Sequence, residues 1–405
     1  MTFLLSINFI ESDKFYQGEY YYLLLSSLLG ALVVSSSRDL LTIFIGIELA
    51  STPMFLLSGW KKGDRKSNEG AIKFFLLGVL SASLILYGFS LIYGLTGQLV
   101  FTDISAYLLA NSLGSSPVIL LSAILVISGI GFKISVVPFH SWAPDTYEGA
   151  PLPITAYLSV SSKATGFVAL IVLLTKVFES SGQSWGVILA FVAGATMTLG
   201  NLVALQQTNP VRLLAYSSIS QAGFIIAPLA ASGITGNYQD GIFASVTYLI
   251  IYAFMNIGAF LSVHLFTNFT KSDNFYEWGG IAKHSPLAGV LTTVFFFSLA
   301  GIPPLGGWFA KFVVFRSLLS TGEIIGISLA IVGAINAVIA LVYYARISKV
   351  IWMDELRNPE EEKSFEFQSP LKVVGAFTVL ITFVAGIFPG IFSYLGEVSS
   401  IFFGN

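Results

Sequence analysis

Long apolar stretches, more than any motif, decide what this chain can fold into. Eleven of them are long enough to cross a lipid bilayer, at about 20–37, 39–59, 69–95, 117–140, 152–178, 184–207, 211–231, 241–269, 285–317, 322–350 and 370–396. A helix needs about 20 apolar residues to cross a hydrocarbon core of about 30 Å. Only 10% of the 405 residues are charged, whereas soluble domains carry about a quarter. The sequence therefore predicts an all-α integral membrane protein with about eleven transmembrane helices in one membrane domain.

The distribution of Lys and Arg predicts how the chain crosses the membrane, because these residues are retained on the cytoplasmic side. With the N-terminus inside, fourteen basic residues fall on the inner side and three on the outer side. We therefore expect the N-terminus inside and the C-terminus outside, in a bacterial plasma membrane or an equivalent energy-converting membrane. No cleaved signal peptide is expected, because the first basic residue, Lys14, follows the first apolar stretch.

Four charged residues lie inside the apolar stretches and away from their ends: Glu48, Lys133, Lys163 and Lys311. A charge at the middle of a membrane costs about 3 kcal/mol on insertion scales, so such residues face the interior of the helix bundle and are functional candidates. The alternative is structural, with ion pairs or lysines that extend to the membrane surface. For Lys133 and Lys163, which lie deep in their stretches, we favour a function.

Buried groups of both signs are what a proton relay requires. Desolvation disfavours the charged form of a lysine, and a nearby carboxylate favours it. If Glu48 lies close to Lys133, that lysine keeps its proton. If the carboxylate moves away or is neutralised, Lys133 can release the proton toward Lys163, and water can carry it on to Lys311.

The fourth and ninth stretches resemble each other in one respect, since each places a lysine beside a proline interruption. Lys133 precedes Pro138, and Lys311 follows the Pro303-Pro304 pair. The two stretches are five apart in order, and a five-helix unit repeated once must reappear inverted, which is typical of transporters. An accidental pair of kinked helices is the alternative. The expected divisions are an N-terminal tail (1–19), a first five-helix unit (20–178), a second unit (184–350) and an additional C-terminal helix (370–396).

Four further polar residues in the eighth stretch are weaker relay candidates. Tyr248, Tyr252 and Asn256 recur at a spacing of four and so share one helix face. His264 lies in the same stretch. These side chains either carry hydrogen-bonded water or pack between helices.

The sequence argues against a cofactor or metal site on this chain. It contains no cysteine, which excludes thiolate-bound iron–sulfur clusters. It also lacks a phosphate-binding loop, a dinucleotide fingerprint and a metal-binding pair of histidines. We expect no complete active site on this chain alone.

Several segments resemble the N subunit of bacterial and chloroplast respiratory complex I, which is equivalent to mitochondrial subunit two. The most specific is GFKISVVPFHSWAPDTYEGAPLPITAYLSVSSKATG (131–166), whose YEGAP element is similar to N subunits more than to their sister antiporter-like subunits. The others follow in the same order and extend the likeness over nearly the whole chain: LLTIFIGIELASTP (40–53), NEGAIKFFLLGVLSASLILYGFSLIYG (68–94), GNLVALQQTNPVRLLAYSSISQAGF (200–224) and SLAGIPPLGGWFAKF (298–312).

The resemblance implies a proton-translocating, antiporter-like subunit of NADH:quinone oxidoreductase, with two inverted five-helix units that each contain a discontinuous helix. It implies that Glu48 pairs with the pumping lysine Lys133, that Lys163 is the connecting lysine, and that Lys311 is the terminal lysine. Bacterial N subunits usually have three more N-terminal helices than this sequence shows.

The resemblance also implies partners. These are lipids and the other membrane subunits of complex I, including sister antiporter-like subunits, and no nucleic acid. NADH, FMN, iron–sulfur clusters and quinone are expected on partner subunits. Three alternatives stay open: a subunit of a multisubunit cation/proton antiporter, a subunit of a membrane-bound hydrogenase, and a structural subunit with inactive ion pairs.

Overall fold

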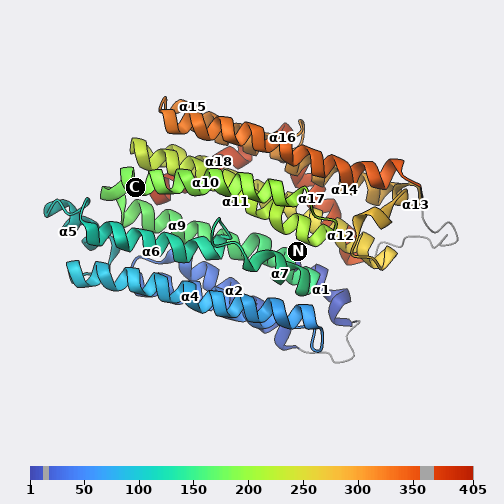
Figure 1. Cartoon of the computed structure of the whole chain (residues 1–405), viewed down its shortest axis with the longest axis horizontal. Coiled ribbons are helices and arrows are strands. Elements are labelled where there is room, and N and C mark those ends of the chain that lie inside the picture. The colour runs from blue at the N-terminus through green and yellow to red at the C-terminus, as the bar shows by residue number, and fades with distance from the viewer. Residues whose placement is uncertain (12–17, 356–368, 405) are drawn as a thin grey trace.

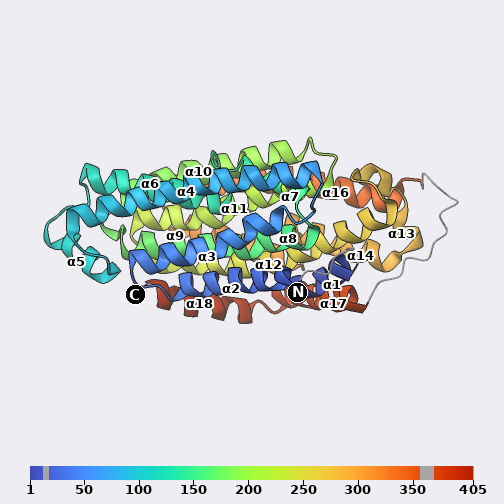
Figure 2. The same cartoon turned by 90° about the horizontal axis from the view of Figure 1, so that it is seen from below.

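The computed structural model describes residues 1–11, 18–355 and 369–404, and these residues are almost entirely helical. Their only β pairing is an isolated bridge between Asp39 and Val100. The long helices lie side by side along one direction (Figures 1 and 2). Ten helices in these parts of the chain are long and apolar enough to cross a membrane. The predicted all-α membrane fold is confirmed.

The helices follow one another along the chain with short connections. They are α1 (Thr2–Glu11), α2 (Glu19–Ser36), α3 (Leu40–Ser58), α4 (Arg65–Thr96), α5 (Phe101–Ala110), α6 (Pro117–Ile134), α7 (Trp142–Gly149), α8 (Leu152–Tyr157), a π-helical turn (Leu158–Ser162), α9 (Lys163–Lys176), a 3-10 turn (Glu179–Ser181), α10 (Gly182–Ala204), α11 (Pro210–Thr235), α12 (Tyr238–Thr270), a second 3-10 turn (Phe275–Trp278), α13 (Ile281–His284), α14 (Pro286–Ala300), α15 (Gly306–Ser320), α16 (Ile324–Met353), α17 (Ser369–Ile387) and α18 (Gly390–Gly404).

Two of the predicted stretches are broken helices. The fourth ends as α6 at Ile134, where Ser135 adopts a left-handed conformation with φ of 59°, and α7 begins only at Trp142. The ninth is divided into α14 and α15, of 15 residues each. Proline has no N–H to donate and cannot continue a helix, so the prolines in each gap explain the interruptions. The division of the ninth stretch accounts for ten long helices where eleven were expected.

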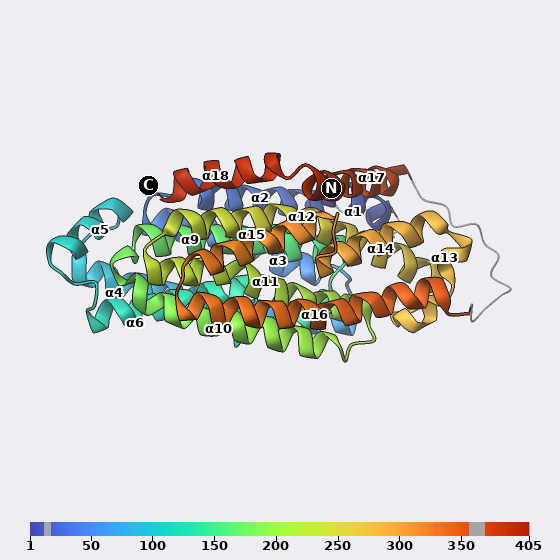
Figure 3. The same ribbon diagram turned by 90° about the horizontal axis from the view of Figure 1, so that it is seen from above.

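Each broken helix packs beside one long continuous helix. The 32-residue α4 runs along both α6 and α7, and the 33-residue α12 runs along both α14 and α15 (Figures 1 and 3). Lipid cannot satisfy the backbone groups that a break leaves free, so breaks persist only where protein or water surrounds them. The long helices therefore cover the gaps on one side.

The fifth predicted stretch (152–178) contains an irregularity that its sequence does not announce. It is formed by α8, the π-helical turn and α9, and the π-helical turn ends immediately before Lys163. A π-helical turn takes up an additional residue and is often found at functional sites. The side chains of α9, which begins at Lys163, are therefore rotated about the helix axis relative to those of α8.

The two ends of the chain also differ from the prediction. Part of the expected N-terminal tail is helical, since α1 packs against α8 and α17; residues 12–17 of that tail lie outside the described residues. The expected last helix (370–396) is two helices, because Pro389 separates α17 from α18, and α18 continues to Gly404.

The end of α17 packs directly on the break between α14 and α15. A Cβ atom at Gly386 would lie 1.8 Å from the carbonyl oxygen of Pro304, and the indole N–H of Trp308 donates to the carbonyl of Gly386 at 3.2 Å. Only a glycine allows two backbones to approach this closely. Helix α17 therefore packs against the second break.

Replacing Gly386 by Ala tests this packing. Because the new methyl group meets backbone rather than a flexible side chain, we expect a loss of about 3 kcal/mol in stability, near the upper end for overpacking. Thermal unfolding in detergent measures the change. Gly390→Ala is the matched control, because a Cβ at Gly390 meets no atom within 4 Å. Equal melting of the two variants would contradict the close packing.

Candidate functional site

The half-buried Glu48 of α3 and the buried Lys133 in the last turn of α6 lie close together. The Nζ atom of Lys133 lies 3.4 Å from the Oε1 atom of Glu48 and donates a hydrogen bond to the Oγ atom of Ser51 at 2.8 Å. Lys133 is only 6% exposed, and the side chain of Glu48 is 28% exposed. The rings of Phe55 and Phe132 flank the ammonium group at 5.6 and 5.8 Å. Lys133 is thus a buried cation with one carboxylate and one hydroxyl partner.

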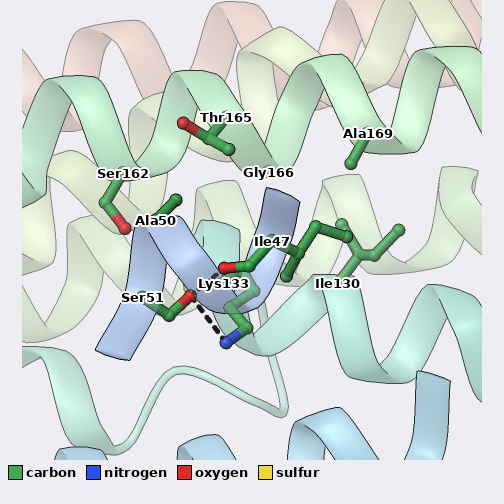
Figure 4. Close-up of a pocket in the computed structure, with 9 residues that line it drawn as sticks. All are labelled: Ile47, Ala50, Ser51, Ile130, Lys133, Ser162, Thr165, Gly166 and Ala169. Carbon is green, nitrogen blue, oxygen red and sulfur yellow. Dashed lines mark hydrogen bonds between the residues drawn. The ribbon is translucent and has the colours of Figure 1, made fainter. Parts of the chain in front are cut away.

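A small pocket continues from Lys133 toward α9, as Figure 4 shows. Lys133 and Ser51 form one side of it, and Ser162 and Thr165 form the wall across from them. Its volume leaves room for about one water molecule. Because hydroxyl groups line both sides, such a water has polar partners.

Lys163 lies on the neighbouring element and points to α11. Its Nζ atom donates to the carbonyl oxygen of Ser218 at 2.8 Å and to the Oγ atom of the same serine at 2.9 Å. The lysine is 1% exposed. One turn along α9, a Cβ at Gly166 would come within 3.3 Å of the Cβ atom of Lys133. The two lysines therefore emerge from helices that touch.

Two tyrosine hydroxyl groups are buried near Ser218 without a hydrogen-bond partner that satisfies the geometry. They belong to Tyr147 of α7 and Tyr252 of α12. Buried polar groups of this kind usually bind ordered water. Lys163 thus lies among polar groups that can accommodate water.

One turn further along α11, Gln221 connects to the second broken helix. Tyr248 donates a hydrogen bond to the Oε1 atom of Gln221. The amide Nε2 group of Gln221 contacts the carbonyl oxygen of Leu299 at 3.2 Å and the hydroxyl group of Tyr344 at 3.4 Å. The amide therefore links α11, α12, α14 and α16.

Lys311 uses the same carbonyl end of α14. Its Nζ atom donates to the carbonyl oxygens of Leu299 at 3.2 Å and Ala300 at 2.6 Å, and it lies 5.2 Å from the centre of the Phe224 ring. The last carbonyls of a helix lack intrahelical partners and carry partial negative charge. The break thus supplies the acceptors for this buried cation, and Leu299 joins Lys311 to Gln221.

The weaker candidates divide into two groups. Tyr248, Tyr252 and Asn256 are buried, and Asn256 donates to the Oγ atom of Ser159 at 2.7 Å, in the π-helical turn before Lys163. His264 instead contacts Asn268 of its own helix at 3.0 Å. The structure therefore places the first three near the lysines, whereas the side-chain contact of His264 lies within its own helix.

A cluster of charged residues, which the sequence analysis missed, holds α7 between α4 and α11. Arg212 contacts both Asp145 and Glu148 at 2.8 Å, Lys73 contacts Asp145 at 2.6 Å, and Lys66 contacts Glu148 at 2.7 Å. Glu69 joins through Lys73 at 2.7 Å. The cluster ties the second half of the broken helix to the start of α11.

The partners of the two α7 carboxyl groups shift their ionisation. Burial raises the pKa of Asp145, but hydrogen bonds from Lys73 and Arg212 outweigh it, so the pKa lies below its usual value. The pKa of Glu148 also lies below its usual value. Burial raises it, but hydrogen bonds from Lys66 and Arg212 outweigh that effect. The ion pairs therefore stabilise the fold above about pH 4, and this stabilisation is lost as the pH falls through the lowered pKa values.

Replacing Arg212 by Met should remove part of this stabilisation. The groups are partly exposed, so we expect a loss of about 1 kcal/mol at neutral pH and a weaker fall of stability between about pH 5 and pH 3 than in the parent. Thermal unfolding in detergent across this range gives both quantities. Lys349→Met is the control, because Lys349 and Asp354 form an exposed pair at 3.9 Å. A parental pH dependence in the Arg212 variant would show that Arg212 does not hold the carboxylates.

No group of His, Asp or Glu that could hold a metal ion occurs within residues 1–11, 18–355 and 369–404. The residues that sequence reasoning missed, such as Ser218 and Gln221, are common polar types in apolar helices. Their only signal in the sequence is their position inside a predicted span.

Comparison with known proteins identifies the family to which the chain belongs. Residues 37–338 match the family described as NADH:quinone oxidoreductase/Mrp antiporter, transmembrane. The chain belongs to this family. It is 40% identical to NADH-quinone oxidoreductase subunit N 2 of Rhizobium meliloti, over 99% of this chain and 81% of that protein. Within the family it therefore groups with the N subunits, and the prediction from the sequence resemblance is confirmed.

Solved structures show the same fold. A chain of respiratory complex I from Thermus thermophilus is 27% identical, with a TM-score of 0.76 over 94% of this chain and 81% of that one. A chain of an archaeal membrane-bound sulfane sulfur reductase gives a TM-score of 0.87 at 24% identity, over 100% of this chain and 79% of that one. The second likeness concerns the fold alone. The family fold is thus found in more than one kind of membrane complex.

Proposed function

We propose that this chain, as an antiporter-like membrane subunit of NADH-quinone oxidoreductase, translocates protons through Glu48, Lys133, Lys163 and Lys311. The observation that carries the proposal is the contact between the half-buried Glu48 and the buried Lys133 at the first helix break, 3.4 Å apart. Charges at this depth are costly and are seldom kept without a function. Membership of the N-subunit group supports the same role.

The contact with Glu48 provides the switch. At an effective dielectric constant of about 20, separating a carboxylate from an ammonium by a few ångströms changes their interaction by a few kcal/mol. While Glu48 stays close, Lys133 keeps its proton. When Glu48 moves or takes up a proton, the Nζ atom of Lys133 passes its proton to water in the pocket beside Ser162, and from there to Lys163.

The second step runs from Lys163 to Lys311. Ser218 and Gln221 lie one turn apart on α11, and they contact Lys163 and the acceptor of Lys311, respectively. Because an amide does not readily take up a proton, water must carry it along this part of the path. The unpartnered hydroxyl groups of Tyr147 and Tyr252 are suited to hold that water.

The partners and cofactors follow from the same role. The chain works with the other membrane subunits of the complex, including sister antiporter-like subunits, within lipid. The sites for NADH, FMN, iron–sulfur clusters and quinone lie on partner subunits. In the bacterial plasma membrane or an equivalent energy-converting membrane, the charged cluster around Arg212 lies at the inner side and the C-terminus at the outer side.

We propose that residues 20–178 and 184–350 form two inverted five-helix units. Support comes from the two broken helices, which lie five predicted stretches apart and each adjoin a buried lysine. Superposition of the two units about an axis in the membrane plane tests the proposal. It should bring α6 and α7 onto α14 and α15, with Lys133 at the end of the first half of its broken helix and Lys311 in the second half of the other.

Replacing Lys133 by Ala tests the relay. We expect normal assembly and a slowing of proton transfer through this chain by about 100-fold or more, the usual size of a lost acid–base group. Proton pumping and NADH oxidation are measured together in vesicles that contain the reconstituted complex. Lys271→Ala, at an exposed loop, serves as the control.

Normal pumping by the Lys133 variant would remove the proposed role. A transport that depends on sodium in the parent would instead favour the cation/proton antiporter alternative. A loss of pumping in both the Lys133 and the Lys271 variants would indicate a general defect of the complex.

A further inference from the structure

A polar pocket of about 130 Å³ lies where α11 and α15 end and α12 begins. Hydroxyl groups, one amide and one carboxylate form its lining. The lining residues are Ser232, Thr235, Asn237, Asp240, Gly241, Ser317, Ser320 and Thr321. The pocket is at the opposite end of α11 from Arg212, and no step of the proposed relay uses it.

The pocket runs from the surface into the bundle. Thr235, Asn237 and Ser320 are exposed, whereas Ser232 and Ser317 are buried at 4% and 3% exposure. Its volume accommodates several water molecules, and its polar lining can bind them. The pocket can therefore hold water that is continuous with the surface at this end of the protein.

Asp240 is the ionisable group of the pocket. It is half-buried in the first turn of α12, and its Oδ2 atom accepts a hydrogen bond from the Oγ atom of Ser320 at 3.3 Å. No ion pair of the described residues includes Asp240. Among the described residues its carboxylate thus has one hydroxyl partner and no cation.

The seam between α11 and α12 leads from this pocket to the surroundings of Lys311. Tyr248 meets Gln221 at the deep end of the seam. About one turn closer to the pocket, the hydroxyl group of Ser245 donates to the carbonyl oxygen of Ile225 at 2.7 Å. At the pocket, a Cβ at Gly241 would lie 2.4 Å from the hydroxyl oxygen of Ser232. Polar groups therefore recur along one antiparallel contact.

A proline adds a free acceptor between the two ends of the seam. Pro228 lies inside α11 and has no N–H, so the carbonyl of Phe224 lacks its helical hydrogen bond. The ring of the same phenylalanine faces Lys311. A free carbonyl in an apolar bundle requires a partner, and water that enters from the pocket can supply one.

We propose that this pocket is the outlet of the relay and that Asp240 is its terminal proton acceptor. The inference rests on the proposed function. A proton leaves the Nζ atom of Lys311, passes through water along the α11–α12 seam, binds the carboxylate of Asp240 and is released to bulk water. Lys311 returns to neutral and Asp240 returns to its anionic form, so charge and protons balance.

Substitution of Asp240 in the complete reconstituted complex tests the outlet. We expect Asp240→Asn to lose most of the proton pumping that depends on this chain, and Asp240→Glu to retain it because a carboxylate remains. Asp103→Asn removes an exposed acid from α5, outside the pocket, and should leave pumping unchanged. Lys133→Ala is measured in parallel.

A second variant keeps the test decisive if Asp240→Asn does not assemble. Because the chain has no cysteine, Ser320→Cys introduces a single thiol at the mouth of the pocket. A bulky, membrane-impermeant thiol reagent should block pumping by this variant when added from one side of the membrane, beyond any effect of the same treatment on the parent complex.

The outcomes separate the two proposals. If Lys133→Ala abolishes pumping while Asp240→Asn pumps normally or the modified Ser320 variant is unaffected, the outlet is elsewhere and only this inference fails. If Lys133→Ala pumps normally, the relay itself fails. Loss of pumping on Asp240→Asn, with retention in Asp240→Glu and Asp103→Asn, supports the outlet.

Discussion

An ammonium group inside lipid must be surrounded by oxygen atoms, and this requirement organises the whole bundle. Lys311 is held by the two last carbonyls of α14, which are available only because the helix ends there. Lys163 binds one serine through both its carbonyl and its hydroxyl group. Lys133 divides its contacts between a carboxylate and a hydroxyl group. Removing water from these charges is costly, so each lysine depends on a local exception to regular helical structure or on a polar neighbour.

Helix α11 contacts the charged cluster on α7 and the surroundings of Lys163 and Lys311. Its first turn holds the α7 carboxylates through Arg212. In its middle, Ser218 contacts Lys163, and Gln221 contacts the carbonyl of Leu299 that also binds Lys311. Its last turns line the pocket with Asp240. Nearly every residue of this helix is buried. A small shift of α11 therefore changes the surroundings of both lysines together, which is a physical route by which the two halves can influence each other.

The sequence was sufficient for features that depend on composition and depth. Long apolar stretches predicted the spans, and charges inside them identified Glu48 and the three lysines. Proline positions predicted the two interruptions. Contacts were beyond its reach, because Glu48 and Lys133 are 85 residues apart and Lys163 and Ser218 are 55 residues apart. A serine or a glutamine in an apolar helix looks the same whether it meets a lysine or packs between helices, so Ser218 and Gln221 could not be selected.

The π-helical turn before Lys163 determines which neighbouring helices the side chains of α9 contact. Successive residues of an α-helix are rotated by about 100°, so one additional residue in a turn changes the phase of everything that follows. With the turn in place, Lys163 meets Ser218 of α11 while Ser162 and Thr165 line the pocket of Lys133. Conversion of Leu158–Ser162 to regular α-helix would rotate α9 about its axis relative to α8. This segment would then no longer face the surroundings of both lysines at once, so the continuity of the proposed path depends on helical phase as well as on chemistry.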